Sequence, residues 1–232
     1  MIHSNKTDFY RHLSFAAVGG FFGAYALLCR SGILANAQTM NLLELVLSAL
    51  RGDLRAVLLH IGVLAVYVAG TMLTVLLPYF CRVDNHKAAV FIDAAALLLL
   101  GFLPQKMNVL LSLYPIFFAM SFQWSSFSGA QDFVSSTIFS TNNTKQTSLA
   151  FAEYLCDKDR AHFRKLRFYG CTLLAFHLGA TVGYFAVKLL ALRGAWLGIA
   201  LTGVAYYMVL CEEAYEKAKL LDDDLPVDAV TE

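Results

Sequence analysis

The sequence predicts an all-α, polytopic transmembrane helical bundle of about six spans, arranged as two inverted three-span repeats that each contain a short half-helix or re-entrant segment. Two observations predict a membrane protein. First, 58% of the 232 residues are hydrophobic and only 15% are charged, against about 25% charged in soluble domains, and the mean hydropathy is +0.59. Second, the apolar residues gather in long runs separated by short polar segments, which is typical of membrane-spanning helices.

The first span is predicted over residues 13–28, after a polar start that includes Lys6 and Arg11. It is shorter than the roughly 20 residues that usually cross a bilayer. Gly19 and Gly23 form a GxxxG pair, which allows another helix to approach closely. Because several apolar runs follow, we expect this run to remain as a span and not to be a cleaved signal peptide.

Five further spans are predicted from runs that are long, apolar and almost free of charge. They are residues 57–80, 88–103, 109–122, 168–192 and 195–210. Pro115 is expected to kink the fourth span of the chain. GxxxG pairs also occur at Gly179 with Gly183 and at Gly194 with Gly198. Such pairs permit a homodimer, and packing within one chain explains them equally well.

Two polar segments interrupt the spans: the first covers residues 33–50 and the second covers residues 136–155. Each joins a cluster of uncharged amide and hydroxyl side chains to a helix too short to cross a bilayer, and Thr39 and Asn41 are expected N-cap residues of the first helix. Uncharged hydrogen-bonding groups suit backbone that is buried at membrane depth, which favours re-entrant segments. The alternative, ordinary interfacial loops with amphipathic helices, has about equal weight.

The order of these elements is repeated. A span, a polar segment with its short helix, and two more spans occur in residues 1–107 and again in 108–211, and an acidic tail follows over 212–232. Asn41 and Asn142 are the matching positions of the two polar segments. Because three spans bring the chain to the other side of the membrane, the second repeat would be inverted relative to the first, which is a common plan of transporters.

Both termini are predicted to be cytoplasmic, in a bacterial plasma (inner) membrane. Six spans place both termini on one side, and the segments on that side carry the larger share of the Lys and Arg residues, much of it within residues 158–167. An excess of Lys and Arg belongs on the cytoplasmic side. The same basic loop is expected to contact anionic lipid.

The two polar segments supply the candidates for a substrate-binding site between the repeats. The candidates are Asn36, Gln38, Thr39 and Asn41 from the first and Gln123, Ser136, Thr137, Ser140, Thr141 and Asn142 from the second and the residues before it. Short helices starting there would direct N–H groups and partial positive charge inward, which suits a small polar or anionic solute, although Glu44 would offset that charge. The alternative is that these groups bond one another and hold the two halves together.

Asp93 and His177 are the candidates for proton or ion coupling. Asp93 is the one acid well inside an apolar span, and an intramembrane acid is a functional candidate by default. It lies close to the start of its predicted span, so pairing with Arg82 or Lys87 is an equal alternative. His177 lies nearer the middle of the fifth span, where a hydrogen-bonded packing role is the more common one for a single histidine.

The sequence gives little support to other classes of protein. There is no HExxH, P-loop or serine-elbow motif, so we expect no enzyme, and the net charge of +1 does not indicate nucleic acid. The five cysteines form no CxxC pair and are interpreted as small hydrophobic residues, so no metal or cofactor is expected. The leading hypothesis is therefore a small-solute transporter with membrane lipid around it, and the alternative is a non-transporting membrane scaffold or sensor whose polar segments are structural.

Five short stretches also carry a resemblance to a known family over roughly residues 14–210. They are GGFFGAY (19–25), ILANAQTMN (33–41), LRGD (50–53), FAMSFQ (118–123) and SSTIFSTN (135–142). The chain resembles the YoaK, or DUF1275, family of bacterial multi-pass membrane proteins, for which no function is established. The family usually has Thr-Gly-Asn in both polar segments, where this chain has Met40 and Thr141 in place of glycine. It often has Asp at the position of Gly23 and Asn at that of Trp124.

Overall fold

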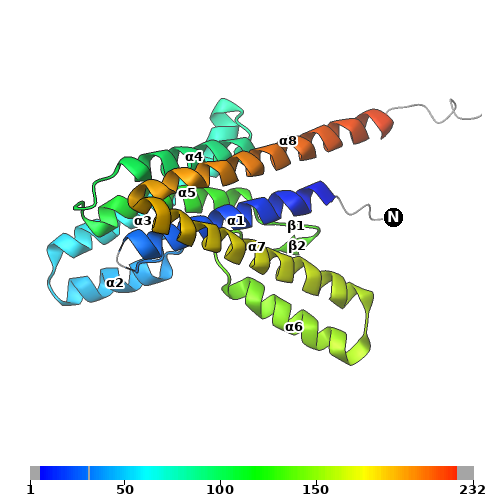
Figure 1. Ribbon diagram of the computed structural model, residues 1–232, viewed down its shortest axis with the longest axis horizontal. Helices are drawn as coiled ribbons and strands as arrows, with labels where there is room; N and C mark the ends of the chain where they lie inside the picture. The colour runs from blue at the N-terminus through cyan, green and yellow to red at the C-terminus, as the bar shows by residue number, and fades with distance from the viewer. Residues whose placement is uncertain (1–5, 31, 224–232) are drawn as a thin grey trace, which may run out of the picture.

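Helices make up nearly all of the computed structural model, which describes residues 6–30 and 32–223 (Figure 1). In chain order the elements are α1 (Lys6–Cys29), α2 (Thr39–Leu50), α3 (Leu54–Cys81), α4 (Asn85–Phe102), α5 (Val109–Ser126), β1 (Gly129–Ala130), β2 (Phe133–Val134), α6 (Thr141–Asp157), α7 (Arg160–Leu190), η1 (Ala191–Leu197) and α8 (Gly198–Asp223). Of the predicted acidic tail, the first part continues α8, and residues 224–232 lie outside the described residues. The all-helical class is confirmed, with a two-stranded hairpin, β1–β2, as a small addition.

Five helical segments of the described chain are long and apolar enough to cross a membrane. They are Lys6–Cys29, Leu54–Cys81, Asn85–Phe102, Val109–Ser126 and Arg160–Leu221. The last contains α7, η1 and α8. Figure 1 shows that the chain reverses direction at η1, so that α8 returns to the end of the molecule at which α7 begins. The five segments support the membrane class that the composition predicts.

Two spans begin earlier than hydropathy alone predicts. Helix α1 has 24 residues because its polar first turns, from Lys6 to His12, are helical as well. Helix α4 begins at Asn85, where the Asp84 side chain accepts a hydrogen bond from the Lys87 N–H at 2.9 Å, a typical N-cap contact. Both helices are therefore long enough to span a membrane. The prediction of a short first span, over residues 13–28, was wrong.

Helix α1 lies inside the bundle and packs along α7 and α8, while α5 packs along α3 and α4. Glycines make the closest of these contacts possible. A Cβ atom on Gly20 would lie 1.8 Å from the Phe176 carbonyl oxygen, and one on Gly179 would lie 1.9 Å from that of Ala17. The two backbones therefore touch, which no larger residue at these positions would permit.

The GxxxG pairs all pack within the chain. A Cβ on Gly19 would meet the Thr137 carbonyl, so this glycine faces a polar segment and not a helix. The other glycines of the pairs likewise face residues of the same chain: Gly23 faces Asn36, Gly183 faces Phe21 and Ala24, Gly194 faces Ala186, and Gly198 faces Phe21. These pairs thus give no argument for a homodimer, which stays a prediction.

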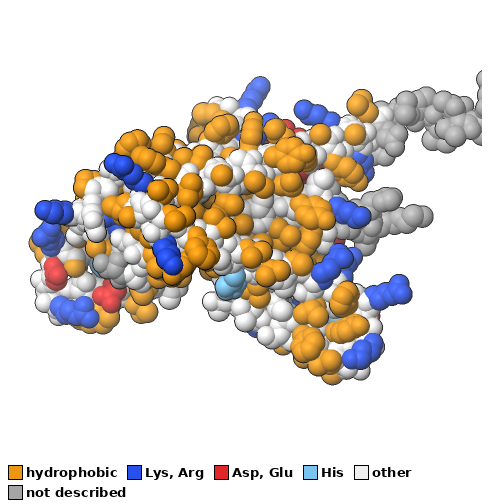
Figure 2. All heavy atoms as spheres, viewed as in Figure 1, with side chains coloured by type: hydrophobic (Ala, Val, Ile, Leu, Met, Phe, Trp, Pro, Cys, Tyr) orange, Lys and Arg blue, Asp and Glu red, His pale blue; other side chains and the backbone are white. Residues whose placement is uncertain are grey.

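The two short helices lie at opposite ends of the bundle (Figure 1), where α2 packs on α3 and α6 packs on α7. Helix α2 has 12 residues, and only the polar Asn41 and Ser48 are buried. Its apolar side chains, such as Leu43 and Leu50, are exposed instead. Figure 2 shows hydrophobic side chains over much of the visible face of the molecule. In α2 the buried side chains are polar and the exposed ones are apolar, which is the reverse of a helix on the surface of a soluble fold and suits a lipid environment.

Candidate functional site

Two side-chain contacts join α1 and α4, which run in the same direction, and they allow the depth of residues in the bundle to be compared. The Arg11 side chain contacts His86 at the end of the bundle where α1 begins, and the Tyr25 hydroxyl lies 3.4 Å from the Leu100 carbonyl toward the opposite end. In each pair the α4 residue is 75 positions after the α1 residue, so the two helices advance in step between the two contacts. Asp93 of α4 and the residues next to Gly19 of α1 therefore lie midway between the two contacts.

The two polar segments meet at this middle level. The fully buried Asn36 side chain donates from Nδ2 to the Gly19 carbonyl at 2.9 Å and to the Ile138 carbonyl at 2.7 Å. Gly19 belongs to α1, and Ile138 belongs to the second polar segment. One amide thus joins both segments to the centre of the bundle, and the choice between re-entrant segments and interfacial loops stays a prediction.

Gln123, at the end of α5, makes a second junction of the same kind. Its Nε2 donates to the Phe15 carbonyl at 3.1 Å and to the Thr137 hydroxyl at 2.8 Å, and the side chain is fully buried. The Oδ1 of Asn36 and the Oε1 of Gln123 have no hydrogen-bond partner among the described residues. Each amide therefore satisfies carbonyl or hydroxyl oxygens of the interior with its donors and leaves its own acceptor unused.

Asn143, and not Asn142, has the same position in α6 as Asn41 has in α2. Each is the third residue of its helix, and both are buried, whereas Asn142 is partly exposed. Asn143 accepts from the Ser135 hydroxyl at 2.9 Å and donates to the Ser136 carbonyl at 2.8 Å. The sequence pairing was wrong by one residue, because the second helix begins at Thr141.

The helix starts also differ from the N-cap prediction. Gln38 and Ser140 occupy the N-cap positions of α2 and α6, and neither side chain caps its helix. Thr39 and Thr141 are the first residues of these helices and are exposed. Gln38 instead accepts a hydrogen bond from Asn41 through Oε1, and the buried Ser136 hydroxyl accepts one from the Ile138 N–H at 3.2 Å.

Two separate cavities lie beside the start of the two short helices. The first, here called the α2 cavity, has a volume of about 250 Å³ and is lined by Ile33, Leu34, Met40, Asn41, Glu44, His60, Leu110 and Phe117. The second, the α6 cavity, has about 460 Å³ and is lined by Trp124, Ser125, Ser128, Val134, Ser135, Ser136, Phe139 and Asn142. The two polar segments touch, and in this structure each of them also lines a cavity of its own.

The two residues proposed for ion coupling lie in different surroundings. Asp93 is the ninth residue of α4 and is fully buried, and neither carboxyl oxygen has a partner among the described residues. The alternative in which Asp93 pairs with Arg82 or Lys87 is therefore wrong. His177 is exposed on α7, and its Nδ1 lies 2.7 Å from the Leu173 carbonyl of the same helix. No cluster of potential metal ligands occurs within residues 6–30 and 32–223.

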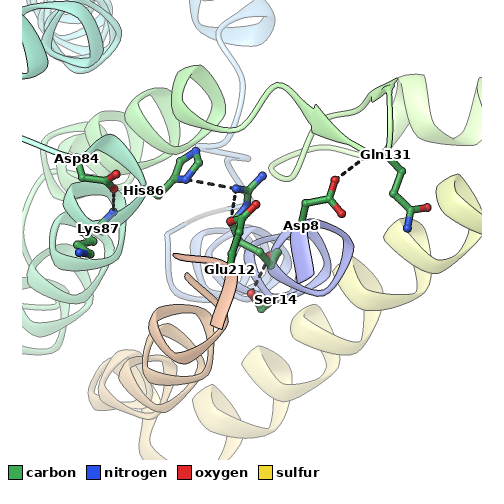
Figure 3. A network of polar contacts seen from close by, with 8 residues as sticks. Asp8, Ser14, Asp84, His86, Lys87, Gln131 and Glu212 are labelled. Atoms are coloured by element: carbon green, nitrogen blue, oxygen red, sulfur yellow. Dashed lines mark hydrogen bonds and ion pairs between the residues drawn. The ribbon is translucent and has the colours of Figure 1, made fainter. Parts of the chain in front are cut away.

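Sequence reasoning missed a buried charge network at the end where α1 begins (Figure 3). Arg11 forms an ion pair with Glu212 of α8, with both side chains less than a tenth exposed, and donates to His86 Nδ1 at 3.3 Å. The Arg11 guanidinium also lies 5.3 Å from the centroid of the Phe127 ring, on which His86 stacks. The network joins α1, α4 and α8 to Phe127, the residue after α5. Since Arg11 and Glu212 are 201 positions apart, no local pattern indicated the pair.

Comparison with known proteins gives a family and no relative of known function. No curated protein and no solved structure matches the chain. A family model described as a protein of unknown function, DUF1275, matches residues 12–208. This match includes the central span α1, both polar segments, both cavities and the mid-level Asp93. Because it covers most of the sequence, the chain belongs to the DUF1275 family.

Proposed function

We propose that this protein is a multi-pass plasma-membrane transporter of a small solute, with a polar site between two inverted repeats. The observation that carries the proposal is the junction at Asn36, where two polar segments from opposite ends of the bundle reach its middle and touch. Broken helices whose short halves start at mid-depth are the usual way in which secondary transporters build a substrate site.

The packing of the helices supports the repeat. Helix α1 packs on α7 and α8 as α5 packs on α3 and α4, and the short helix α2 packs on α3 as α6 packs on α7. These relations are what residues 1–107 and 108–211 would give if they were two copies of one unit. In that arrangement the chain crosses the membrane six times, through α1, α3, α4, α5, α7 and α8.

The distribution of positive charge supports an orientation with both termini in the cytoplasm of a bacterium. Figure 1 places the start of α1, the turn between α6 and α7, and the end of α8 at one end of the molecule. The basic residues 158–167 belong to that turn and to the start of α7, and such residues prefer the cytoplasmic side. The α2 cavity would then face outward, and the α6 cavity would face the cytoplasm.

Transport would require the two cavities to open in turn toward the junction at Asn36. Asp93 is the stronger candidate for coupling, because it lies at the level of the junction, buried and without a hydrogen-bond partner among the described residues. His177 is the weaker candidate, because it faces away from the bundle. We propose no enzymatic activity and no cofactor.

A non-transporting scaffold or sensor is the alternative function, and one observation favours it. Asn36 and Gln123 direct their donors to oxygens of the protein's own interior, as purely structural groups would. In that case the two cavities would stay closed to each other, and lipid or another membrane protein would be the partner.

Cysteine labelling separates these functions. In a variant without the five native cysteines, Met40→Cys places one thiol in the α2 cavity, and Asn142→Cys places one in the α6 cavity. Leu174→Cys on the exposed face of α7 is the control. A transporter should show both cavity thiols reacting with an impermeant maleimide from either side of the membrane. Reaction from only one side for each thiol contradicts transport and supports the scaffold.

A further inference from the structure

The α2 cavity offers hydrogen-bond acceptors and no free donor side chain. Asn41, which forms part of its wall, is fully used. Its Nδ2 donates to Gln38 Oε1 at 2.8 Å and to the His60 carbonyl at 3.3 Å, and its Oδ1 lies 2.7 Å from His60 Nδ1. The amide orientation is fixed by the His60 carbonyl, which can only accept.

This arrangement determines the role of the His60 ring. Because Asn41 Oδ1 can only accept, His60 Nδ1 must donate the hydrogen bond between them. In the neutral ring the other nitrogen, Nε2, is then an acceptor, and it has no partner among the described residues. His60 is 92% buried and lines the cavity, so this acceptor is held at the cavity wall by Asn41.

Glu44 is the one charged residue among those that line the cavity. Its carboxylate lies 3.5 Å from Arg51, and both of these side chains are more than 40% exposed, so the contact is weak. Glu44 is in the second turn of α2, where its carboxylate adds negative charge to the cavity wall. An anion is therefore disfavoured in this cavity, and a cation is favoured.

The remaining wall is apolar and restricts the size of a ligand. Ile33, Leu34, Met40, Leu110 and Phe117 provide it, and an aromatic ring such as that of Phe117 also favours a cation near its face. A volume of about 250 Å³ is just below the roughly 300 Å³ at which most ligand pockets begin. The cavity is therefore larger than an inorganic ion needs and fits a small organic molecule.

We propose that the α2 cavity binds a small organic ammonium ion, with the ammonium group between the Glu44 carboxylate and His60 Nε2 and the apolar part against Phe117. This inference deepens the proposed function, on which it rests, by naming the chemical class of the solute. It replaces the anionic solute that helix N-termini alone would suggest.

Three probes of one shape test the proposal: benzylammonium, benzyl alcohol and benzoate, titrated at neutral pH into the full chain in phosphatidylcholine nanodiscs. Thermal unfolding should show a saturable rise in Tm with benzylammonium, and at least a tenfold weaker response to the other two. Glu44→Gln should weaken benzylammonium binding at least tenfold. The control is Glu153→Gln on α6, which removes a partly buried acid that does not line the cavity and should leave binding unchanged.

A second variant keeps the test decisive if Glu44→Gln does not fold. Met40 is 50% exposed at the cavity, so Met40→Trp narrows the space with little effect on the core and should also abolish the benzylammonium response. Equal responses to all three probes, or binding that survives both variants, would overturn the ammonium site. Saturable benzylammonium binding together with one-sided cysteine labelling would preserve the site and reject transport. Cysteine labelling from both sides without benzylammonium binding would support transport and reject the ammonium site.

Discussion

The Nδ2 of Asn36 lies 2.7 Å from the carbonyl oxygen of Ile138, a residue 102 positions later in the chain. This hydrogen bond links the first polar segment to the second at the middle of the bundle. Both groups are completely buried, so no water replaces the bond when it is lost. The stability of the chain and the geometry of any central site therefore depend on the same amide.

Asn36→Ala should destabilise the protein strongly. The change leaves the Ile138 carbonyl without its donor, and an unpaired buried polar group costs about 1–3 kcal/mol. Thermal unfolding in detergent or nanodiscs measures the loss. Asn142→Ala is the control, since Asn142 is partly exposed, and it should change the free energy of unfolding by less than about 0.5 kcal/mol. Equal effects of the two changes would contradict the central role of Asn36.

Gly20→Ala and Gly179→Ala should each weaken the contact between α1 and α7. The added methyl group would overlap a backbone carbonyl of the facing helix, and overpacking of this kind costs about 1–3 kcal/mol. Gly170→Ala and Gly203→Ala are matched controls, because an added Cβ would meet nothing within 4 Å at either position. In these helices the controls should stabilise by up to about 1 kcal/mol. A uniform response of all four glycines would argue against the packing described.

Arg11→Ala should be among the most destabilising single changes outside the apolar core. It leaves Glu212 buried without its cation, which typically costs about 3–5 kcal/mol. The neighbouring ion pair between Lys87 and Glu213 is more exposed, so Lys87→Ala should cost at most about 1 kcal/mol. The double change Arg11→Met with Glu212→Leu should recover most of the lost stability. Failure of this rescue would show that the network acts through other partners.

Asp93→Val should stabilise the fold, by roughly 1–3 kcal/mol, because it removes a buried polar group that has no partner within the described residues. Asp93→Asn keeps the shape and remains polar, so it should change the unfolding temperature much less. A stabilised Asp93→Val protein that no longer responds to a proton gradient would indicate that the acid is retained for function. Strong destabilisation by Asp93→Val would instead mean that the carboxyl group has a structural role.

The membrane class, the two polar segments and their short helices follow from composition and hydropathy alone. The starts of α1 and α4 did not, because polar turns such as Asn85 to Lys87 lower the hydropathy without ending the helix. The match of Asn41 to Asn142 missed by one residue, because an unbroken polar run over residues 140–148 gave no sign of which side chain would be buried.

Tertiary contacts account for the rest of the difference. The pair of Arg11 with Glu212 and the contact of Gly19 with Thr137 join residues far apart in the chain, which one sequence does not reveal. The separation into two cavities is a matter of the same kind. It depends on which groups Asn36 and Gln123 bond to. The sequence shows that these side chains can form hydrogen bonds, but it does not show their partners.

The junction at Asn36 also has a thermodynamic consequence for the two cavities. A ligand in the α2 cavity that alters the position of the first polar segment acts, through the Ile138 carbonyl, on the segment that lines the α6 cavity. Linkage then requires a ligand of the second cavity to alter affinity in the first by the same factor. Measuring that factor in Asn36 variants would express, as a single free energy, how strongly the two halves of the molecule sense each other.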